Sequence, residues 1–411
     1  MGNFLEILNQ GIKAYNEYVG GYLILALLLP TGIYFTFKLR FLQVRGFWHA
    51  IRIVAGKYSK KDDKGDINHF KALTTALSAT VGTGNIVGVA LAIHYGGPGA
   101  IFWMWVTGFF GMMIKMVECT LAQKFRKTNA DGSVSGGPMY YMEMGLKDKL
   151  GKYAKWLSVV FASAAILCSM GTGNMAQSNS MSDVLLTNYN IPVLYTGLAT
   201  ALLVLLIVVG GLKRIAEVTS RLVPFMAIFY FIAAITVVIL HLNWLPGAFA
   251  LIFKEAFSPS AAGGGIVGSA FIMTLTWGVR RGLFSNEAGQ GSAPMAHAAA
   301  KTPYPMREGL VASLEPFVDT LFICTLTAIV IIMTGAYNSG IAGVGMTVEA
   351  FRTGLDAINL GWFAPHIVAA GLLLFAFSTI VSWSYYGTRA SQYLFGDKAI
   401  KPYYYVYCIF V

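Results

Sequence analysis

The apolar positions of this chain fall into long continuous runs separated by short polar or basic connections. A run of about 20 mostly apolar residues is long enough to cross the hydrocarbon core of a bilayer as one helix. Such runs recur from Tyr22 to the last residue. The pattern predicts membrane helices near residues 19–38, 70–95, 99–123, 153–186, 192–211, 214–241, 264–298, 307–335 and 363–395, and one more that begins near residue 402.

Composition agrees with this pattern. Apolar residues make up 56% of the chain and charged residues only 12%, and the mean hydropathy is +0.61. A soluble globule of this size needs more polar surface than that. We therefore expect one all-α, polytopic membrane domain over residues 1–411. The four cysteines lie in apolar runs without metal-type spacing, so packing is the role expected of Cys119, Cys168, Cys324 and Cys408.

The net charge of +11 is distributed unevenly between alternate connections. Of the 30 Lys and Arg residues, 23 fall on one side of the predicted helices and only Lys13, Lys254 and Arg352 on the other. By the positive-inside rule the basic side is cytoplasmic and the N-terminus lies outside the plasma membrane. The excess charge therefore indicates orientation, and no nucleic-acid partner is expected.

The same alternation predicts two blocks of opposite orientation. The helices of residues 70–241 form a first five-helix repeat that begins on the cytoplasmic side, and residues 262–411 begin a second repeat on the outer side. The helix at 19–38 is an extra N-terminal one. Inverted repeats of this kind are typical of secondary transporters. The second repeat is short by one helix, and the chain stops within an apolar run, so we expect the natural sequence to continue.

The helix predicted at 70–95 carries Val-Gly-Thr-Gly-Asn at residues 81–85, near its middle. Gly84 and Gly88 are four residues apart, which also suits close helix packing. However, Thr83 and Asn85 bring a hydroxyl and an amide to mid-membrane depth, where an unpaired polar group is costly. The first helix of the second block has its own interruption at residues 273–278, and breaks at matching positions of two repeats indicate a central binding site.

A broken helix suits a zwitterionic ligand. Unwinding exposes free N–H groups at the start of one half-helix and free C=O groups at the end of the other. The N–H end attracts a carboxylate, and the C=O end attracts a cation or an ammonium group. An amino acid carries both charges, so two broken helices can hold its backbone.

Three motifs resemble those of known transporters. Residues 81–85 resemble the V-G-x-G-N segment of the sodium-coupled LeuT-fold transporters. Gly-Gly-Pro-Gly-Ala-Ile-Phe-Trp-Met-Trp at 96–105 and Ser-Asn-Glu-Ala-Gly-Gln-Gly-Ser-Ala-Pro at 285–294 are similar to stretches of one family of that fold, the alanine or glycine:cation symporters. The resemblance covers essentially the whole chain. It implies a 5+5 inverted-repeat fold and sodium-coupled import of a small neutral amino acid, alanine or glycine, by alternating access.

The resemblance also implies roles for particular residues. The substrate carboxylate is expected at the backbone of Gly82, Thr83 and Gly84, with Asn85 donating from its side chain. Its ammonium group is expected at carbonyls and hydroxyls around Met273, Thr274 and Thr276, and the pocket walls at Met170, Asn174 and Trp277. One sodium ion is expected, with oxygen ligands from Ser78, Val81, Phe375, Ser378 and Thr379. Oxygen ligands suit a hard cation.

Charged residues within the predicted helices should pair or line water. Lys115 with Glu118 and Glu217 with Arg221 have the spacing of local helical pairs. Arg280, Arg281 and Glu287 follow the second predicted break on its cytoplasmic side, and we expect them to contribute to an inner gate. His297 is expected to be a boundary residue, with a proton relay as the alternative.

Other classes of protein remain as alternatives. An intramembrane enzyme would also bury carboxylates, but the chain has neither H-E-x-x-H nor G-x-S-x-G. An ion channel fits two inverted breaks less well than a transporter does. A proton-coupled amino acid permease of the same fold is separated from the sodium symporter mainly by Ser378 and Thr379. We expect a functional monomer in the lipid bilayer and no enzymatic activity.

Overall fold

The computed structural model describes residues 6, 9–11, 15–60, 62–129, 132–257 and 267–411. Within these residues, six helical segments are long and apolar enough to cross a membrane, and a bent pair adds a seventh. The six are Gly20–Lys38, Ala100–Lys124, Lys152–Tyr189, Gly211–Leu240, Pro305–Met333 and Gly361–Phe395.

Several of these segments contain more than one helical type. The first consists of a π-helical stretch, Tyr15–Leu23, and α2 (Ile24–Lys38). The third consists of α10 (Lys152–Met170), a π-helical turn (Gly171–Met175) and α11 (Ala176–Tyr189). The second and fourth segments are the single helices α7 (Ala100–Lys124) and α13 (Gly211–Leu240). The fifth consists of α17 (Pro305–Ala312), α18 (Leu314–Pro316), a π-helical stretch (Phe317–Cys324) and α19 (Thr325–Met333). The sixth consists of a 3₁₀ turn (Gly361–Phe363) and α21 (Ala364–Phe395).

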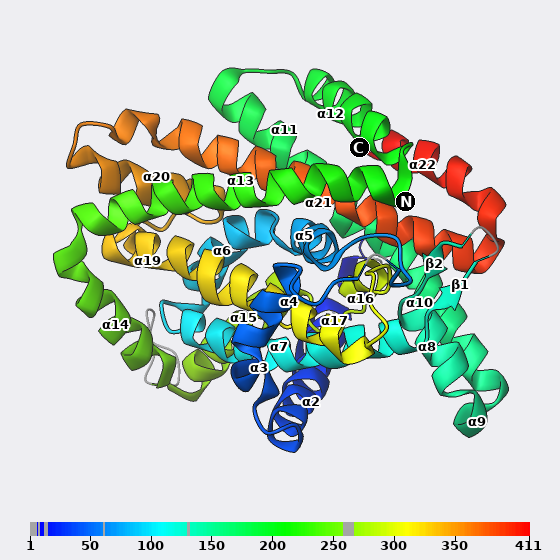
Figure 1. Cartoon of the computed structure of the whole chain (residues 1–411). Helices are drawn as coiled ribbons and strands as arrows, with labels where there is room; N and C mark the ends of the chain where they lie inside the picture. The colour runs from blue at the N-terminus through cyan, green and yellow to red at the C-terminus, as the bar shows by residue number, and fades with distance from the viewer. Residues whose placement is uncertain (1–5, 7–8, 12–14, 61, 130–131, 258–266) are drawn as a thin grey trace.

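The bent pair confirms the first predicted break. Helix α5 (His69–Thr80) and the segment Thr83–Gly96, which contains a 3₁₀ turn and α6 (Val87–Gly96), meet at an angle of 62°. Figure 1 shows α5 and α6 near the middle of the molecule. Helix α5 packs against α13 and α21, and α6 packs against α15 (Val267–Asn286). The break is therefore enclosed by helices from both halves of the chain.

The second break is not where the sequence pattern placed it. Helix α15 runs without interruption through residues 273–278. A Cβ on Gly278 would lie 2.3 Å from the Ala100 carbonyl oxygen, and one on Gly282 would lie 2.1 Å from Thr107 Oγ1. These glycines allow α15 to approach α7 closely.

The helix ends instead at Asn286. Glu287, Gly289 and Gly291 all have positive φ angles, of 54°, 81° and 79°, which a continuing right-handed helix does not allow. The chain then enters the short helix α16 (Ala293–His297). The interruption of the 264–298 segment therefore lies at residues 287–292, 14 residues later than the predicted 273–278.

Shorter elements complete the chain. The antiparallel pair β1 (Lys127–Thr128) and β2 (Val134–Ser135) and helices α14 and α20 were not predicted. The remaining helices are α3 (Leu42–Arg45), α4 (Phe47–Val54), α8 (Pro138–Gly145), α9 (Lys147–Leu150), α12 (Val193–Val208), α14 (Leu245–Phe257), α20 (Val344–Asp356) and α22 (Ile400–Ile409), with 3₁₀ turns at Leu242–Trp244, Ala336–Asn338 and Asp397–Ala399.

Helix α12 shows the polarity expected of a lipid-facing helix. Leu194, Leu198 and Leu202 follow one another at one-turn spacing, and each is more than half exposed. Thr196 and Thr200, on the opposite face, are buried. Apolar residues outside and hydroxyls inside reverse the pattern of a water-soluble helix, because lipid does not favour burial of leucine.

Candidate transport site

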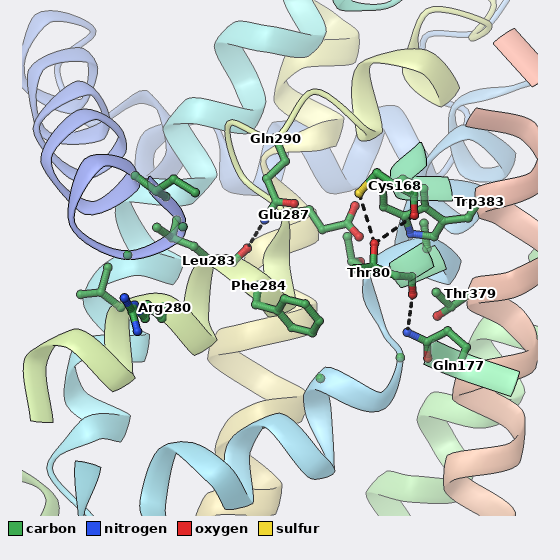
Figure 2. Close-up of a pocket in the computed structure, with 18 of the residues that line it drawn as sticks. Thr80, Cys168, Gln177, Arg280, Leu283, Phe284, Glu287, Gln290, Thr379 and Trp383 are labelled. Atoms are coloured by element: carbon green, nitrogen blue, oxygen red, sulfur yellow. Dashed lines mark hydrogen bonds between the residues drawn. The ribbon is translucent and has the colours of Figure 1, made fainter. Parts of the chain in front are cut away.

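A cavity of about 370 Å³ lies beside the first break. Its lining comes from the segment before and within α2, both sides of the break, the third span, the end of α15 and α21. Figure 2 shows Thr80, Gln177, Phe284, Glu287 and Thr379 around it. The cavity is therefore formed where the two halves of the chain meet at the interrupted helix.

Side chains hold the break open. The Gly82 amide donates to Asn85 Oδ1 at 2.9 Å, and Asn85 Nδ2 donates to Asp319 Oδ1 at 2.7 Å. Asp319 also accepts a hydrogen bond from the Ser285 hydroxyl at 2.7 Å. Both ends of the Asn85 amide therefore have protein partners in this structure, whereas its side chain was predicted to donate to substrate.

Two backbone amides in the break remain close to the cavity. The Thr83 amide donates to Gln177 Oε1 over a long distance of 3.4 Å. In the described part of the chain, the Gly84 amide donates to no protein acceptor. Gly82 and Gly84 both line the cavity. A free N–H at the start of a half-helix can donate a hydrogen bond to an anionic group.

The third span faces the cavity with different residues from those predicted. Cys168, Thr172 and Gln177 line it. Asn174 is buried on another face, where its Nδ2 donates to the Tyr407 carbonyl at 2.7 Å, and Met170 does not line the cavity. Cys168 and Thr172 are one turn apart, so they share a face that excludes Met170. The wider spacing of the π-helical turn at Gly171–Met175 carries this face on to Gln177, five residues after Thr172.

The five oxygen-bearing residues predicted on α5, at the break and on α21 come together. Thr379 Oγ1 lies 3.2 Å from the Ser78 carbonyl oxygen, 3.4 Å from that of Val81 and 3.0 Å from that of Phe375. Ser378 Oγ lies 3.2 Å from the Ser78 carbonyl and 2.9 Å from that of Phe375. All five residues are buried.

Such a cluster has the dimensions of a small ligand shell. Two oxygens at about 2.4 Å from a hard cation and 90° apart lie about 3.4 Å from each other. The measured oxygen separations of 2.9–3.4 Å are slightly shorter, as expected when hydroxyls donate directly to the carbonyls. A small outward movement of the two hydroxyls would therefore fit these oxygens to an ion.

The residues predicted on α15 do not reach the first break. Thr274 and Trp277 pack against Gly96 at the far end of α6, about 15 Å along that helix from the break. Trp277 stacks on Tyr95 with ring centroids 4.6 Å apart, and Met273 is half exposed on the surface. Thr276 is buried but belongs to the same uninterrupted stretch, so none of the four offers unwound carbonyls.

The end of α15 reaches the break in their place. A Cβ on Gly84 would lie 3.5 Å from the Phe284 ring and 3.6 Å from Ser285 Cα. Glu287 begins the loop, lines the cavity and accepts a hydrogen bond from the Ser292 hydroxyl. Figure 2 shows the Glu287 carboxylate pointing into the space beside Thr80 and Cys168. Among the described side chains, Glu287 has no ion-pair partner within 4 Å.

The predicted gate residues are also placed differently. Because the interruption lies at 287–292, Arg280 and Arg281 precede it and do not follow it. The Arg281 guanidinium lies over the rings of Trp277 and Phe284, at 5.2 and 5.8 Å from their centroids. Arg280 lines the cavity, with its guanidinium against Gly21. A gate on the far side of the second break is therefore not formed by these two arginines.

Comparison with known proteins identifies the class. The sequence profile described as the sodium:alanine symporter family matches residues 5–411. The chain belongs to the sodium:alanine symporter family. The symporter is 43% identical over 397 residues to the sodium/alanine symporter AgcS of Methanococcus maripaludis, an alignment that covers 95% of this chain and 85% of that one.

Other relatives are named for a different coupling ion or substrate. One is the putative sodium/proton-dependent alanine carrier protein YrbD of Bacillus subtilis, 39% identical, with 92% of this chain and 77% of that one covered. Another is the probable sodium/glutamine symporter GlnT of the same organism, 38% identical, with 96% and 79% covered. The family and these relatives are transporters, so this protein is a symporter and not an enzyme.

A solved structure shows the same fold. It is the substrate-bound, outward-open state of a Na+-coupled sialic acid symporter, which matches 96% of this symporter and 80% of that chain with a TM-score of 0.54 and 13% identity. The likeness confirms the predicted all-α membrane transporter fold of LeuT type.

Three residues that brace the cavity were not assigned to the site from the sequence. Gln177, Asp319 and Ser285 are polar residues of apolar spans, and only their depth in the membrane distinguished them from packing residues. Glu287 was noticed as a charge and was assigned to a gate. The signal for its position was Gly289 and Gly291, two closely spaced glycines that mark the end of α15.

Proposed function

We propose that this protein imports a small neutral amino acid, alanine or glycine, together with sodium by alternating access. The observation that carries the proposal is the convergence of the Ser78, Val81, Phe375, Ser378 and Thr379 oxygens beside the break. Five uncharged oxygens suit a monovalent hard cation. The cluster joins α5 to α21, so an ion bound there favours one arrangement of these helices over another.

The cavity supports a zwitterionic substrate. The free Gly84 amide, with the weakly bonded Thr83 amide, is the receptor for the carboxylate. Glu287 is the receptor for the ammonium group, because a carboxylate at membrane depth needs a cationic partner and no ion pair satisfies it among the described residues. This assignment replaces the carbonyls of residues 273–276, which belong to an intact helix.

Sodium and substrate are coupled through the break. Gly82 and Gly84 line the substrate cavity, and Val81, next to them, contributes to the oxygen cluster. Ordering this short segment for one ligand favours the binding of the other. Each ligand should therefore raise the affinity for the other by the same factor.

Orientation follows from the distribution of charge. The strongly basic connections belong on the cytoplasmic side of the plasma membrane, with the N-terminus outside. The two repeats are residues 70–241 and 262–411, and one monomer in the bilayer contains a complete cavity. One sodium ion accompanies each substrate.

The test is uptake of labelled alanine by proteoliposomes under an inward sodium gradient, an inward proton gradient or neither. Unlabelled glycine and glutamine serve as competitors, since relatives are named for different substrates. We expect uptake to require sodium and to be inhibited by glycine more strongly than by glutamine.

The same experiment separates the alternatives. Uptake that follows the proton gradient and ignores sodium would support a proton-coupled permease and would contradict the ion site. Stronger competition by glutamine would contradict the substrate assignment but leave the sodium site intact. A current that does not saturate and needs no amino acid would indicate a channel.

A further inference from the structure

A network of five buried side chains, those of His69, Glu308, His297, Glu315 and Lys115, joins the start of α5 to α7. The imidazole of His297 lies between two carboxylates: its Nδ1 is 2.6 Å from Glu308 Oε1, and its Nε2 is 2.7 Å from Glu315 Oε1. The second oxygen of Glu308 contacts His69 Nδ1, and that of Glu315 lies 3.2 Å from Lys115 Nζ. All five side chains are at most 2% exposed.

The contacts in this network differ from two of the predictions. Lys115 pairs with Glu315 across two spans, whereas a local pair with Glu118 was expected. His297 is fully buried between two acids and is not a boundary residue. By contrast, the predicted local pair of Glu217 and Arg221 is present at 2.8 Å.

The contacts of His297 require a bound proton. A neutral imidazole has one N–H and one bare nitrogen, and an ionised carboxylate only accepts. Two short contacts to two carboxylates are therefore both hydrogen bonds only when an extra proton resides on His297 or on one of the acids. With that proton, the charges of Lys115 and His297 balance those of Glu308 and Glu315. Without it, a net negative charge is left in a dry interior, which is costly.

The network joins a helix that precedes the first break, α5, to a helix that follows the second break, α16. His69 is the first residue of α5, nine residues before Ser78 on the same helix. His297 is the last residue of α16, which follows the interruption at 287–292.

Backbone contacts strengthen this junction. The Asp66 amide donates to the Ala299 carbonyl at 2.8 Å, and the Lys301 amide donates to the Ile67 carbonyl at 2.8 Å. From α7, Gln123 Nε2 donates to the His297 carbonyl at 2.5 Å. The junction therefore fixes the base of α5 relative to three other elements.

We propose that His297 is a positioning residue of the transport cycle: sharing one bound proton with Glu308 and Glu315, it clamps the base of α5 to the segment after the second break. The clamp holds the Ser78 and Val81 carbonyls in place for the ion. Other titratable groups close to this network are Glu118, Cys119, Arg126, Glu287 and Tyr386. The effect on sodium rests on the proposed function, whereas the clamp itself does not.

Glu308→Gln is the decisive variant. An amide can turn its NH₂ to a neutral His297 and its carbonyl oxygen to the N–H of His69, so all contacts are kept without the extra proton. His297→Gln cannot bridge both carboxylates and should break the clamp. His49→Gln is the control, because His49 is exposed on α4 and lies outside the network.

Two measurements are made on purified full-length protein from about pH 6, close to the titration range of an ordinary histidine, to about pH 10, well above that range. One is the thermal unfolding temperature in detergent, and the other is the sodium concentration that half-saturates alanine uptake. In the wild type and His49→Gln, the unfolding temperature should fall and half-saturation should rise about fivefold or more at alkaline pH. Glu308→Gln should show neither change, and His297→Gln should require more sodium at every pH.

The proposal is overturned if Glu308→Gln follows the wild-type pH profile in unfolding. It is also overturned if the unfolding profiles differ as expected but sodium half-saturation never does, because His297 would then be structural only. If uptake proves independent of sodium, the proposed function fails, and the difference in unfolding between Glu308→Gln and the wild type still decides the clamp. That comparison also stands if His297→Gln does not fold.

Discussion

Replacing Thr379 by valine tests the ion site most directly. Valine has nearly the same shape as threonine but lacks the hydroxyl, so the substitution removes one of five oxygens with little change in packing. Thr379 Oγ1 is the most connected of these oxygens, within 3.4 Å of three carbonyls. Its loss should weaken sodium binding without opening a cavity.

The magnitude follows from the interaction that is lost. A hydrogen bond or dipole contact to a charged group is worth about 1.5–3 kcal/mol. The sodium concentration for half-maximal alanine uptake should therefore rise about 10- to 150-fold, since about 1.4 kcal/mol corresponds to a factor of ten. The maximal rate at saturating sodium should change much less.

The assay is alanine uptake by proteoliposomes over a range of sodium concentrations, with Thr388→Val as matched control. Thr388 is a buried threonine of the same helix, and its hydroxyl donates to the carbonyl one turn earlier, at 2.7 Å, as that of Thr379 does at 3.0 Å. Thr379→Ser, which keeps the hydroxyl, should stay close to the wild type. A half-saturation for Thr379→Val within about twofold of that for Thr388→Val would refute the site, since unrelated substitutions scatter by that much.

Three further tests, which use four substitutions, concern the break and the cavity. Gly82→Ala should raise sodium half-saturation, because its Cβ would lie 2.7 Å from Thr379 Oγ1, whereas Gly88→Ala, with its nearest atom 3.9 Å away, should not; equal sodium curves for the two would argue against the link between break and ion site. Glu287→Gln should weaken alanine binding, measured by calorimetry at saturating sodium, about tenfold or more through loss of a charged partner, and unchanged affinity would exclude Glu287 as the ammonium receptor. Met273→Ala should leave alanine uptake unchanged, because Met273 is half exposed on intact α15; a large loss of alanine affinity would restore the original assignment.

The sequence by itself determined the class of structure and the first break. Long apolar runs predict spanning helices because the backbone must satisfy its own hydrogen bonds in lipid. Gly82 and Gly84 predict a break because their neighbours Thr83 and Asn85 bring polar groups to mid-membrane depth, where an unpaired polar group is costly. The five oxygens near the break were also found, because a resemblance to known motifs supplied the pairing of α5 with α21.

Only the tertiary structure decided which glycines break a helix and which pack one. Gly278 belongs to the interruption predicted at residues 273–278, but it lies against α7, as Gly282 does, and the left-handed turns come at Glu287, Gly289 and Gly291. Likewise, the cavity face of the third span carries Thr172 and Gln177, five residues apart across a π-helical turn, whereas Met170 and Asn174 were predicted. The residues around a glycine do not show which helix will pack against it. They also do not show where a π-turn will change which side chains share a helix face. The pairing of Lys115 with Glu315 and of His297 with two acids depends on residues brought together across spans, and so folding alone established it.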